Sequence, residues 1–223
     1  MSSADAASTR TRGFKKKERT RRLLLTAAVE EIALTGEAFT VLDVTKRADV
    51  SNGTFYNYFD DRDALIDAVI AEVLTSFTDT SAERVTFDDP VRRFATITAL
   101  LLEQSAANPH LATVLMRLHS ATHIDTSTSD PFRHLRNDLA EAAAQGRLAQ
   151  EPTDAAVDLV TGTLSRAVLR LTTADLPGAY RRELIALLLK GFGLDAGEAD
   201  EIAGEAVAIA PELALAYRAG GSP

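Results

Sequence analysis

The stretch VSNGTFYNYF, residues 50–59, gathers four of the chain's thirteen aromatic residues within ten positions. The whole protein of 223 residues is only 6% aromatic and contains no tryptophan, so this concentration calls for a structural reason. On a helix of 3.6 residues per turn, Phe55 and Phe59 share a face and are expected to pack inward. Tyr56, Tyr58 and the small polar residues between the aromatics are then left to point outward. The stretch therefore predicts a short helix that is anchored in a core and presented to a partner.

Two helices are predicted upstream of this one. The first runs from about residue 17 to residue 35, with apolar residues three and four positions apart. Thr40 is a candidate N-cap, and Asp43 three residues later gives a near capping box for a second, short helix. Ser51 is expected to cap the helix of the aromatic stretch. Two short helices joined by a tight turn form a helix-turn-helix, whose second member can enter the major groove of DNA.

The residue types on the outer side of the aromatic stretch suit DNA. Gly53 has no side chain, so a partner can approach the backbone closely there. The hydroxyls of Thr54 and the two tyrosines can donate to phosphates, and an asparagine such as Asn52 can read an adenine edge bidentately. An entirely internal aromatic cluster is the alternative, but it would not explain the glycine or the polar residues.

The charge of the chain is distributed unevenly. The net charge of −8 argues against a nucleic-acid partner, yet residues 10–22 hold eight basic residues against one acid. Residues 1–62 carry 11 Lys/Arg against 9 Asp/Glu, whereas residues 63–223 carry 13 against 23. A basic end on an acidic body predicts DNA binding through the N-terminal part. We expect residues 1–16 to form a flexible basic arm along phosphates or in the minor groove, with a merely solvated terminus as the alternative.

Residues 27–65 resemble the TetR family of bacterial transcriptional regulators, most specifically in the pattern VS-x-GT-x-Y-x-YF. The resemblance implies an all-α fold in which a three-helix helix-turn-helix DNA-binding domain, residues 17–62, precedes a larger helical ligand-binding and dimerisation domain, residues 63–223. It also implies release of DNA when a ligand binds. By position, Asn52 and Tyr56 lie among the family's base-proximal residues. Residues that fall where family members hold phosphates are Ser51, Thr54, Tyr58 and Arg62.

The sequence departs from the family pattern at three positions. Asp49 stands where the family usually has a glycine in the turn, and aspartate tolerates left-handed backbone better than most residues. Leu42 replaces a polar residue and cannot read guanine, and Thr45 replaces a usual alanine, which we interpret as a small perturbation. The expected DNA-contacting residues are Thr40, Lys46, Ser51, Asn52, Gly53, Thr54, Tyr56, Asn57, Tyr58 and Arg62.

No enzymatic or cofactor-binding motif stands out: GxGxxG, phosphate-loop, HExxH and GxSxG patterns are absent, so neither catalysis nor a cofactor is expected. His119 and His123 are four residues apart and could share a metal, but further ligands are not evident, so no metal site is expected. Cysteine is absent, which excludes disulfides and thiolate sites. Neither a secretory signal nor an apolar run of membrane-spanning length is found, so we expect a soluble, cytoplasmic protein with no membrane partner.

The resemblance implies a small-molecule effector, and we expect its pocket among the helices between residues 91 and 146. Apolar residues available to line that pocket are Phe94, Ile97, Leu101, Leu115, Met116 and Leu118. Ordinary core packing is the alternative for each of them.

Two predicted helices, residues 153–173 and 179–192, each carry apolar residues on two faces. One face is enough to pack a helix onto its own domain, so the second predicts a homodimer through a four-helix bundle. The expected interface residues are Leu159, Gly162, Arg166, Leu169, Ile185, Leu189 and Phe192. The alternative is a thick monomer core in which the C-terminal helix covers the second faces.

Together these features predict a dimeric repressor that binds a near-palindromic operator in double-stranded DNA and is released by a small hydrophobic effector. The alternative is a DNA-binding, nucleoid-associated helical protein with no sequence preference and no effector. The acidic second part of the chain argues against that alternative, because it would be repelled by a coat of DNA.

Overall fold

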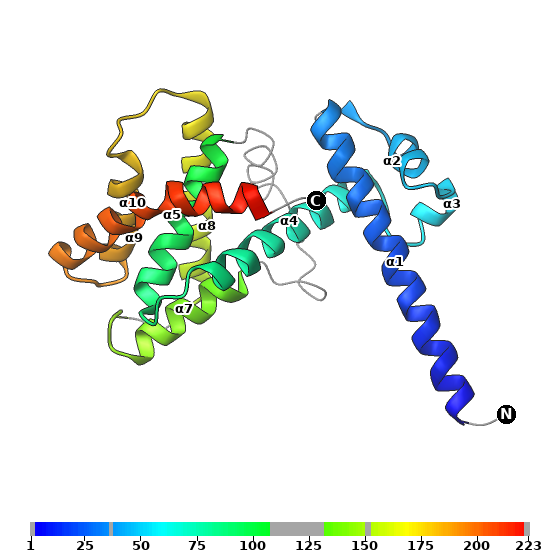
Figure 1. Ribbon diagram of the computed structural model, residues 1–223, viewed down its shortest axis with the longest axis horizontal. Helices are drawn as coiled ribbons and strands as arrows, with labels where there is room; N and C mark the ends of the chain where they lie inside the picture. The colour runs from blue at the N-terminus through cyan, green and yellow to red at the C-terminus, as the bar shows by residue number, and fades with distance from the viewer. Residues whose placement is uncertain (1–2, 36–37, 108–131, 150–152, 221–223) are drawn as a thin grey trace. The chain divides into compact units, whose positions relative to one another are not determined.

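Figure 1 shows the computed structural model of the protein, which describes residues 3–35, 38–107, 132–149 and 153–220. Within these ranges the regular structure is helical and no strand is present. The chain divides into two compact units, residues 1–69 and 70–223. The boundary lies seven residues beyond the predicted one and falls inside helix α4, Arg62–Arg84. Among the described residues no helix is long and apolar enough to cross a membrane.

The first unit contains α1 (Ser3–Thr35), α2 (Val41–Arg47), α3 (Asn52–Phe55) and the start of α4. Its core is built from one face of α1 and the aromatic anchors around α3, as the helical spacing predicts. The fully or nearly fully buried members include Leu24, Ala28, Phe39, Val44, Phe55, Phe59 and Leu65. Burying a phenylalanine or leucine side chain contributes roughly 1.5–3 kcal/mol, so these anchors help to hold the short helices α2 and α3 in place.

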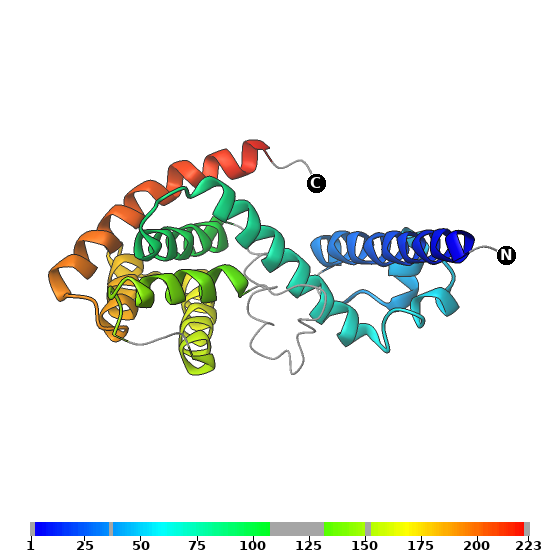
Figure 2. The ribbon, with the colours of Figure 1, turned by 90° about the horizontal axis from the view of Figure 1, so that it is seen from below.

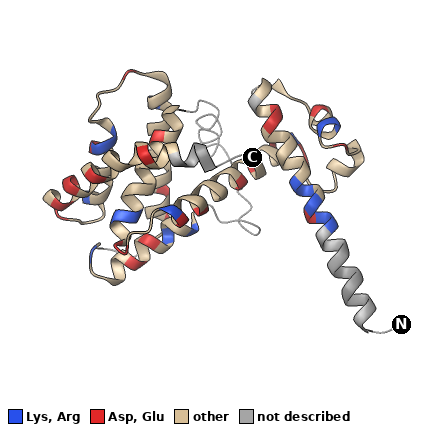
Figure 3. Cartoon of the chain, viewed as in Figure 1, with Lys and Arg blue, Asp and Glu red and all other residues tan. Residues whose placement is uncertain are grey.

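Helix α1 is longer than the sequence analysis predicts, because it begins at Ser3. Residues 3–16, expected as a flexible arm, therefore continue the helix in the structure. The physical reason is local: alanine, lysine, arginine and glutamate are strong helix formers, and Gly13 is the only strong breaker before residue 22. The basic residues of α1 whose side chains are described lie within one short stretch, residues 16–22 (Figure 3), and all but the half-buried Arg21 are exposed.

The second unit contains the remainder of α4 together with α5 (Pro90–Ala107), α7 (Arg133–Ala144), α8 (Asp154–Thr173), α9 (Tyr180–Gly191) and α10 (Ala196–Gly220). Helix α10 packs along α5 and α9, and α5 also packs on α7 and α8 (Figure 2). Five of these helices supply one continuous core that includes Phe94, Leu139, Val160, Ile185 and Ile202. Helix α5 is thus the central helix of this unit.

The helix starts in the second unit follow the expected capping signals. Asp89 Oδ1 accepts a hydrogen bond from Val91 N–H at 2.9 Å, immediately before α5. Thr153 Oγ1 accepts from Ala156 N–H at 3.2 Å and caps α8. Side-chain oxygens at these positions satisfy backbone donors that the first turn of a helix leaves free.

Candidate DNA interface and effector cavity

The N-terminus of α2 carries the predicted capping box. Asp43 N–H donates to Thr40 Oγ1 at 3.3 Å, and Thr40 N–H donates to Asp43 Oδ2 at 2.8 Å. The Thr40 hydroxyl also donates to Asp43 Oδ2 at 2.7 Å. The side-chain and backbone hydrogen bonds from Thr40 lower the pKa of Asp43 below its usual value. Both donors of Thr40 are used by this carboxylate, so the predicted N-cap is confirmed, whereas the DNA contact of Thr40 stays a prediction.

The turn between α2 and α3 adopts the expected left-handed backbone, with a φ of 53° at Asp49. Val50 N–H donates to the Thr45 carbonyl at 3.0 Å and closes the end of α2. Ser51 then caps α3: its Oγ accepts from Thr54 N–H at 3.1 Å and lies 2.9 Å from Thr54 Oγ1. The helix-turn-helix is therefore fixed by local hydrogen bonds at each of its corners.

The aromatic side chains around α3 divide between core and surface. Phe55 is fully buried and Phe59 nearly so, and their ring centroids are 5.7 Å apart. Tyr56 is 59% exposed, whereas Tyr58 is half-buried. The packing role predicted for the two phenylalanines is confirmed, and only one of the two tyrosines is fully available to a partner.

The outer edge of α3 is open around Gly53. A Cβ added at Gly53 would meet only Ser51 Oγ, at 3.9 Å, so no internal packing requires a glycine at this position. Asn52 and Asn57 are exposed on the same short segment, and Thr54 is half-buried. This edge has the small size and the hydrogen-bonding groups that a close approach to DNA requires.

The cations of the first unit have different surroundings. Arg47 is paired with Glu31 at 2.6 Å and with Glu30 at 3.1 Å, which ties α2 to α1. The Arg62 guanidinium lies over the Phe39 ring, 4.6 Å from its centroid, at the start of α4. Lys46 is exposed near the end of α2. Because Arg47 is held by two glutamates, Lys46 is better placed than Arg47 to meet a phosphate.

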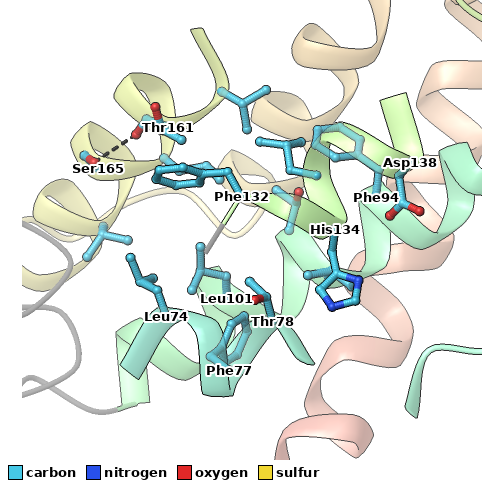
Figure 4. A pocket seen from close by; sticks show the side chains of 16 residues that line it. Leu74, Phe77, Thr78, Phe94, Leu101, Phe132, His134, Asp138, Thr161 and Ser165 are labelled. Carbon is cyan, nitrogen blue, oxygen red and sulfur yellow. Dashed lines mark hydrogen bonds between the residues drawn. The ribbon is translucent and has the colours of Figure 1, made fainter. Parts of the chain in front are cut away.

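The second unit contains a partly open, apolar cavity of about 90 Å³ (Figure 4). One water needs roughly 10–15 Å³ by the same measure, so the space is large enough for a small organic molecule. Three residues predicted to line a pocket, Phe94, Ile97 and Leu101, form part of its wall. The other three, Leu115, Met116 and Leu118, lie outside the described residues. The remaining wall residues come from α4 (Leu74, Phe77, Thr78), α5 (Thr98), the start of α7 (Phe132, His134, Leu135, Asp138) and α8 (Val160, Thr161, Leu164, Ser165, Val168).

Polar side chains lie on two sides of this cavity, with Thr161 and Ser165 on one side and His134 and Asp138 on the other (Figure 4). The Thr161 hydroxyl donates to the Val157 carbonyl at 2.9 Å, and the Ser165 hydroxyl donates to the Thr161 carbonyl at 2.8 Å. Their protons are thus used within α8, which leaves their oxygens as acceptors.

Asp138 is nearly buried beside the cavity. Burial raises its pKa above the usual value, while the hydrogen bond from Arg93 Nε to Asp138 Oδ1, at 2.9 Å, opposes that shift. Arg93 also donates to Glu141 and to the carbonyls of Phe87 and Asp88, the last two at 2.9 and 3.1 Å. The guanidinium is therefore surrounded by acceptors on the protein, and Asp138 presents an acidic group to the cavity.

His134 links the cavity wall to α4. Its Nε2 lies 2.7 Å from Asp79 Oδ1, and Arg133 donates to the same oxygen at 2.8 Å. Neither His134 nor Asp138 is predicted as a pocket residue from the sequence. The only feature of the sequence that points to them is their spacing of four residues, which places both side chains on one face of α7. The other residue of α7 that lines the cavity, Leu135, is apolar.

The predicted dimer residues fall into two groups. On α8, Leu159 is 51% exposed, Arg166 is exposed, and Gly162 and Leu169 are half-buried. On α9, by contrast, Ile185 and Leu189 are fully buried within the core of the chain.

Phe192, which follows α9, packs against the same core, with its ring centroid 6.4 Å from that of Phe94. The assignment of Ile185, Leu189 and Phe192 to an open face is corrected, because α10 and α5 cover that side of α9. The exposed leucine of α9 is Leu187, at 69%.

His119 and His123, the pair considered for metal binding, lie outside the described residues. Among the residues that the structure describes, no group of three or more His, Asp or Glu side chains could hold a metal ion.

The capped α2–turn–α3 arrangement with an open outer edge on α3 defines a helix-turn-helix DNA-binding protein. Residues 24–69 match the family model of bacterial regulatory proteins of the tetR family. The crystal structure of RolR in complex with the ligand resorcinol is similar to this chain, with 29% sequence identity and a TM-score of 0.71. The match covers 85% of this chain and 95% of the RolR chain. RolR without ligand matches at 27% identity and a TM-score of 0.68, over 82% of this chain and 95% of its own.

A curated relative is YvdT of Bacillus subtilis (strain 168), an uncharacterized helix-turn-helix transcriptional regulator, which is 23% identical over 76% of this chain and 93% of its own length. On these grounds residues 24–69 form a helix-turn-helix unit of the tetR type, and the chain is similar to TetR-family transcriptional regulators.

Proposed function

We propose that the protein is a homodimeric repressor that leaves a near-palindromic operator when a small hydroxylated aromatic compound enters the cavity of its second unit. The observation that carries this proposal is the apolar cavity with Asp138 and His134 at one side. TetR-family regulators bind DNA and small molecules, and the similar protein RolR has been crystallised with resorcinol.

The lining of the cavity favours one kind of ligand. Phenylalanine and leucine side chains such as Phe77, Leu101 and Leu164 suit the faces and edges of a single aromatic ring. At the acidic side, Asp138 can accept a hydrogen bond from a hydroxyl group but would repel a carboxylate. The hydroxyl oxygens of Thr161 and Ser165 offer further acceptors on the opposite side. A neutral ring with hydroxyl groups therefore fits this lining better than an aromatic or fatty acid does.

Helix α4 supplies the route from ligand to DNA. Leu74, Phe77 and Thr78 on α4 line the cavity, and the same helix begins at Arg62, a predicted phosphate contact. Asp79, also on α4, is held by Arg133 and His134 of α7. A ligand that moves His134 or the α4 wall would shift this helix, so ligand binding and DNA binding would oppose each other.

Two exposed leucines support a homodimer. Leu159 on α8 and Leu187 on α9 are large apolar side chains open to solvent on the two helices predicted to pair. Pairing across a two-fold axis would cover these side chains in both subunits at once. It would also set two α3 helices to read half-sites roughly 34–36 Å apart, which is the geometry of a near-palindromic operator.

The proposal is tested with purified protein and an operator selected from random duplexes. A thermal-shift series with resorcinol, phenol and benzoate is followed by fluorescence anisotropy on the bound operator. We expect resorcinol and phenol to raise the melting temperature and release DNA, and benzoate to do neither. Equal stabilisation by benzoate would refute the argument from Asp138. Ligands that bind without changing DNA affinity would remove induction and leave DNA binding alone. Random duplexes that bind as tightly as the selected site would favour the non-specific DNA-binding alternative.

A further inference from the structure

A side-chain hydrogen bond crosses the turn of the helix-turn-helix. Thr45, on α2, is only 2% exposed, and Asn52 is the first residue of α3 and is exposed. The Thr45 Oγ1 lies 2.8 Å from Asn52 Oδ1. This contact joins an internal hydroxyl to a side chain on the outer edge of α3, where the sequence analysis expected only a small perturbation from Thr45.

The proton of the Thr45 hydroxyl decides the orientation of the Asn52 amide. That single proton has two acceptors within reach, Asn52 Oδ1 at 2.8 Å and the Leu42 carbonyl at 3.1 Å. O–H···O bonds are most often about 2.7–2.8 Å long, so the amide oxygen is the better acceptor. With its oxygen turned toward α2, the amide of Asn52 has its NH₂ group left for a partner.

An amide that offers only its NH₂ group reads different bases from an amide that is free to turn. Pairing with adenine needs both ends of the amide, because the oxygen must accept from N6 while the nitrogen donates to N7. Guanine presents two neighbouring acceptors, N7 and O6, in the major groove, and cytosine presents a donor. An NH₂ group therefore favours guanine and is unfavourable opposite cytosine.

We propose that Thr45 is a specificity-determining residue that holds Asn52 as a hydrogen-bond donor, so that the base read by Asn52 is guanine rather than adenine. The inference rests on the proposed function, because it requires α3 to enter the major groove of an operator. Thr45 itself does not touch DNA; it is a positioning residue that acts through Asn52. The adenine contact that the sequence analysis considered for Asn52 is replaced by this assignment.

The test uses the full-length protein and a selected operator in which each base pair is substituted in turn. Asn52→Ala first identifies the base pair that Asn52 reads, as the position where discrimination disappears. Thr45→Val keeps the shape of the side chain and removes the hydroxyl. In this variant the preference for guanine over adenine at that base pair is expected to fall about 3- to 10-fold, the loss of one oriented hydrogen bond. Thr45→Ser, which retains the hydroxyl, should restore the preference.

Thermal melts of both Thr45 variants separate a change of reading from a loss of fold, since a purely structural role would weaken binding to all sites equally. The inference is overturned if Thr45→Val leaves the preference at that base pair unchanged, or if the wild-type protein prefers any base other than guanine there. If Asn52→Ala still binds the operator specifically and keeps its preference at every base pair, the inference is refuted but the proposed function is not. If no sequence is selected over random DNA, both fall.

Discussion

Replacing Gly53 by alanine should change stability and DNA binding in opposite directions. In the free protein the new Cβ would meet only Ser51 Oγ, at 3.9 Å, which is an ordinary van der Waals contact. The backbone at Gly53 does not have a positive φ, so alanine can adopt it. Alanine is favoured over glycine in a helix by roughly 0.5–1 kcal/mol. For a chain of this size we expect a rise in melting temperature of about 1–4 °C.

In the complex with DNA the same methyl group would occupy the space into which the operator must come. Pushing a phosphate away from the edge of α3 removes a hydrogen bond to a charged group, which is worth about 1.5–3 kcal/mol. The affinity for the operator, measured by fluorescence anisotropy at fixed salt, should therefore fall roughly 10- to 100-fold.

Gly204→Ala on α10 is the matched control for this variant. Its new Cβ would lie 3.8 Å from Arg182 Cδ, so it should stabilise the helix and leave DNA binding unchanged. A Gly53→Ala protein that is more stable and binds the operator as tightly as the wild type would refute the close approach of DNA at this glycine.

Three further changes test the dimer, the cavity and the cap. Leu159→Glu puts a charge at the exposed leucine of α8 and should give folded monomers in light scattering. The control Leu215→Glu, at a 65% exposed leucine of α10, should leave the dimer intact. A folded Leu159 variant that stays dimeric would contradict the proposed interface. Asp138→Asn keeps an acceptor but removes the charge, so calorimetry should show about tenfold weaker resorcinol binding. Burial raises the pKa of Asp138 above its unfolded value near 3.8. The contribution of Asp138 to folding stability is therefore present below pH 3.8 and is lost as the pH rises through the folded pKa. Melting curves recorded at a series of pH values should show this dependence in the wild type and not in the asparagine variant. Thr40→Ala should cost about 1 kcal/mol as a lost N-cap. Thr40 lowers the pKa of Asp43, so the wild type should be more stable than the Thr40→Ala variant above pH 3.8, and this difference in stability should shrink as the pH falls through the lower folded pKa. A difference that does not change with pH would show that the cap does not depend on this carboxylate.

The parts of the DNA-binding unit that could be predicted are those whose cause is local in sequence. The Thr40–Asp43 box, the left-handed turn at Asp49 and the Ser51 cap each depend on groups within a few residues of one another. The burial of Phe55 follows from helical spacing alone. Such features are encoded in short stretches, so one sequence is enough to find them.

The dimer face shows where periodicity stops being informative. Helical spacing predicts two apolar faces on α9, but it does not say which residues meet the chain's own core. Ile185 and Leu189 are buried because α10 and α5 lie against them, and Leu187 is left exposed. That choice depends on packing between helices that are distant in sequence, which the pattern within one helix does not contain. Residues 3–16 are a different case, because their charge pattern indicates a flexible arm while their helix propensity favours the helix that the structure shows.

The acidic side of the cavity depends on tertiary contacts in a stronger sense. In the sequence, Asp138 is one of several charged residues on an amphipathic helix, and an aspartate there is normally exposed. Burying a charged carboxylate is costly unless it is paired, and its partner Arg93 lies 45 positions earlier in the chain. Only when α5 and α7 are adjacent does the pair exist. Because Arg93 is shared with Glu141 and with two backbone carbonyls, its positive charge is offset by several acceptors at once. The proposed preference of the cavity for a hydroxyl over a carboxylate thus depends on contacts between helices, and no motif in the sequence indicates it.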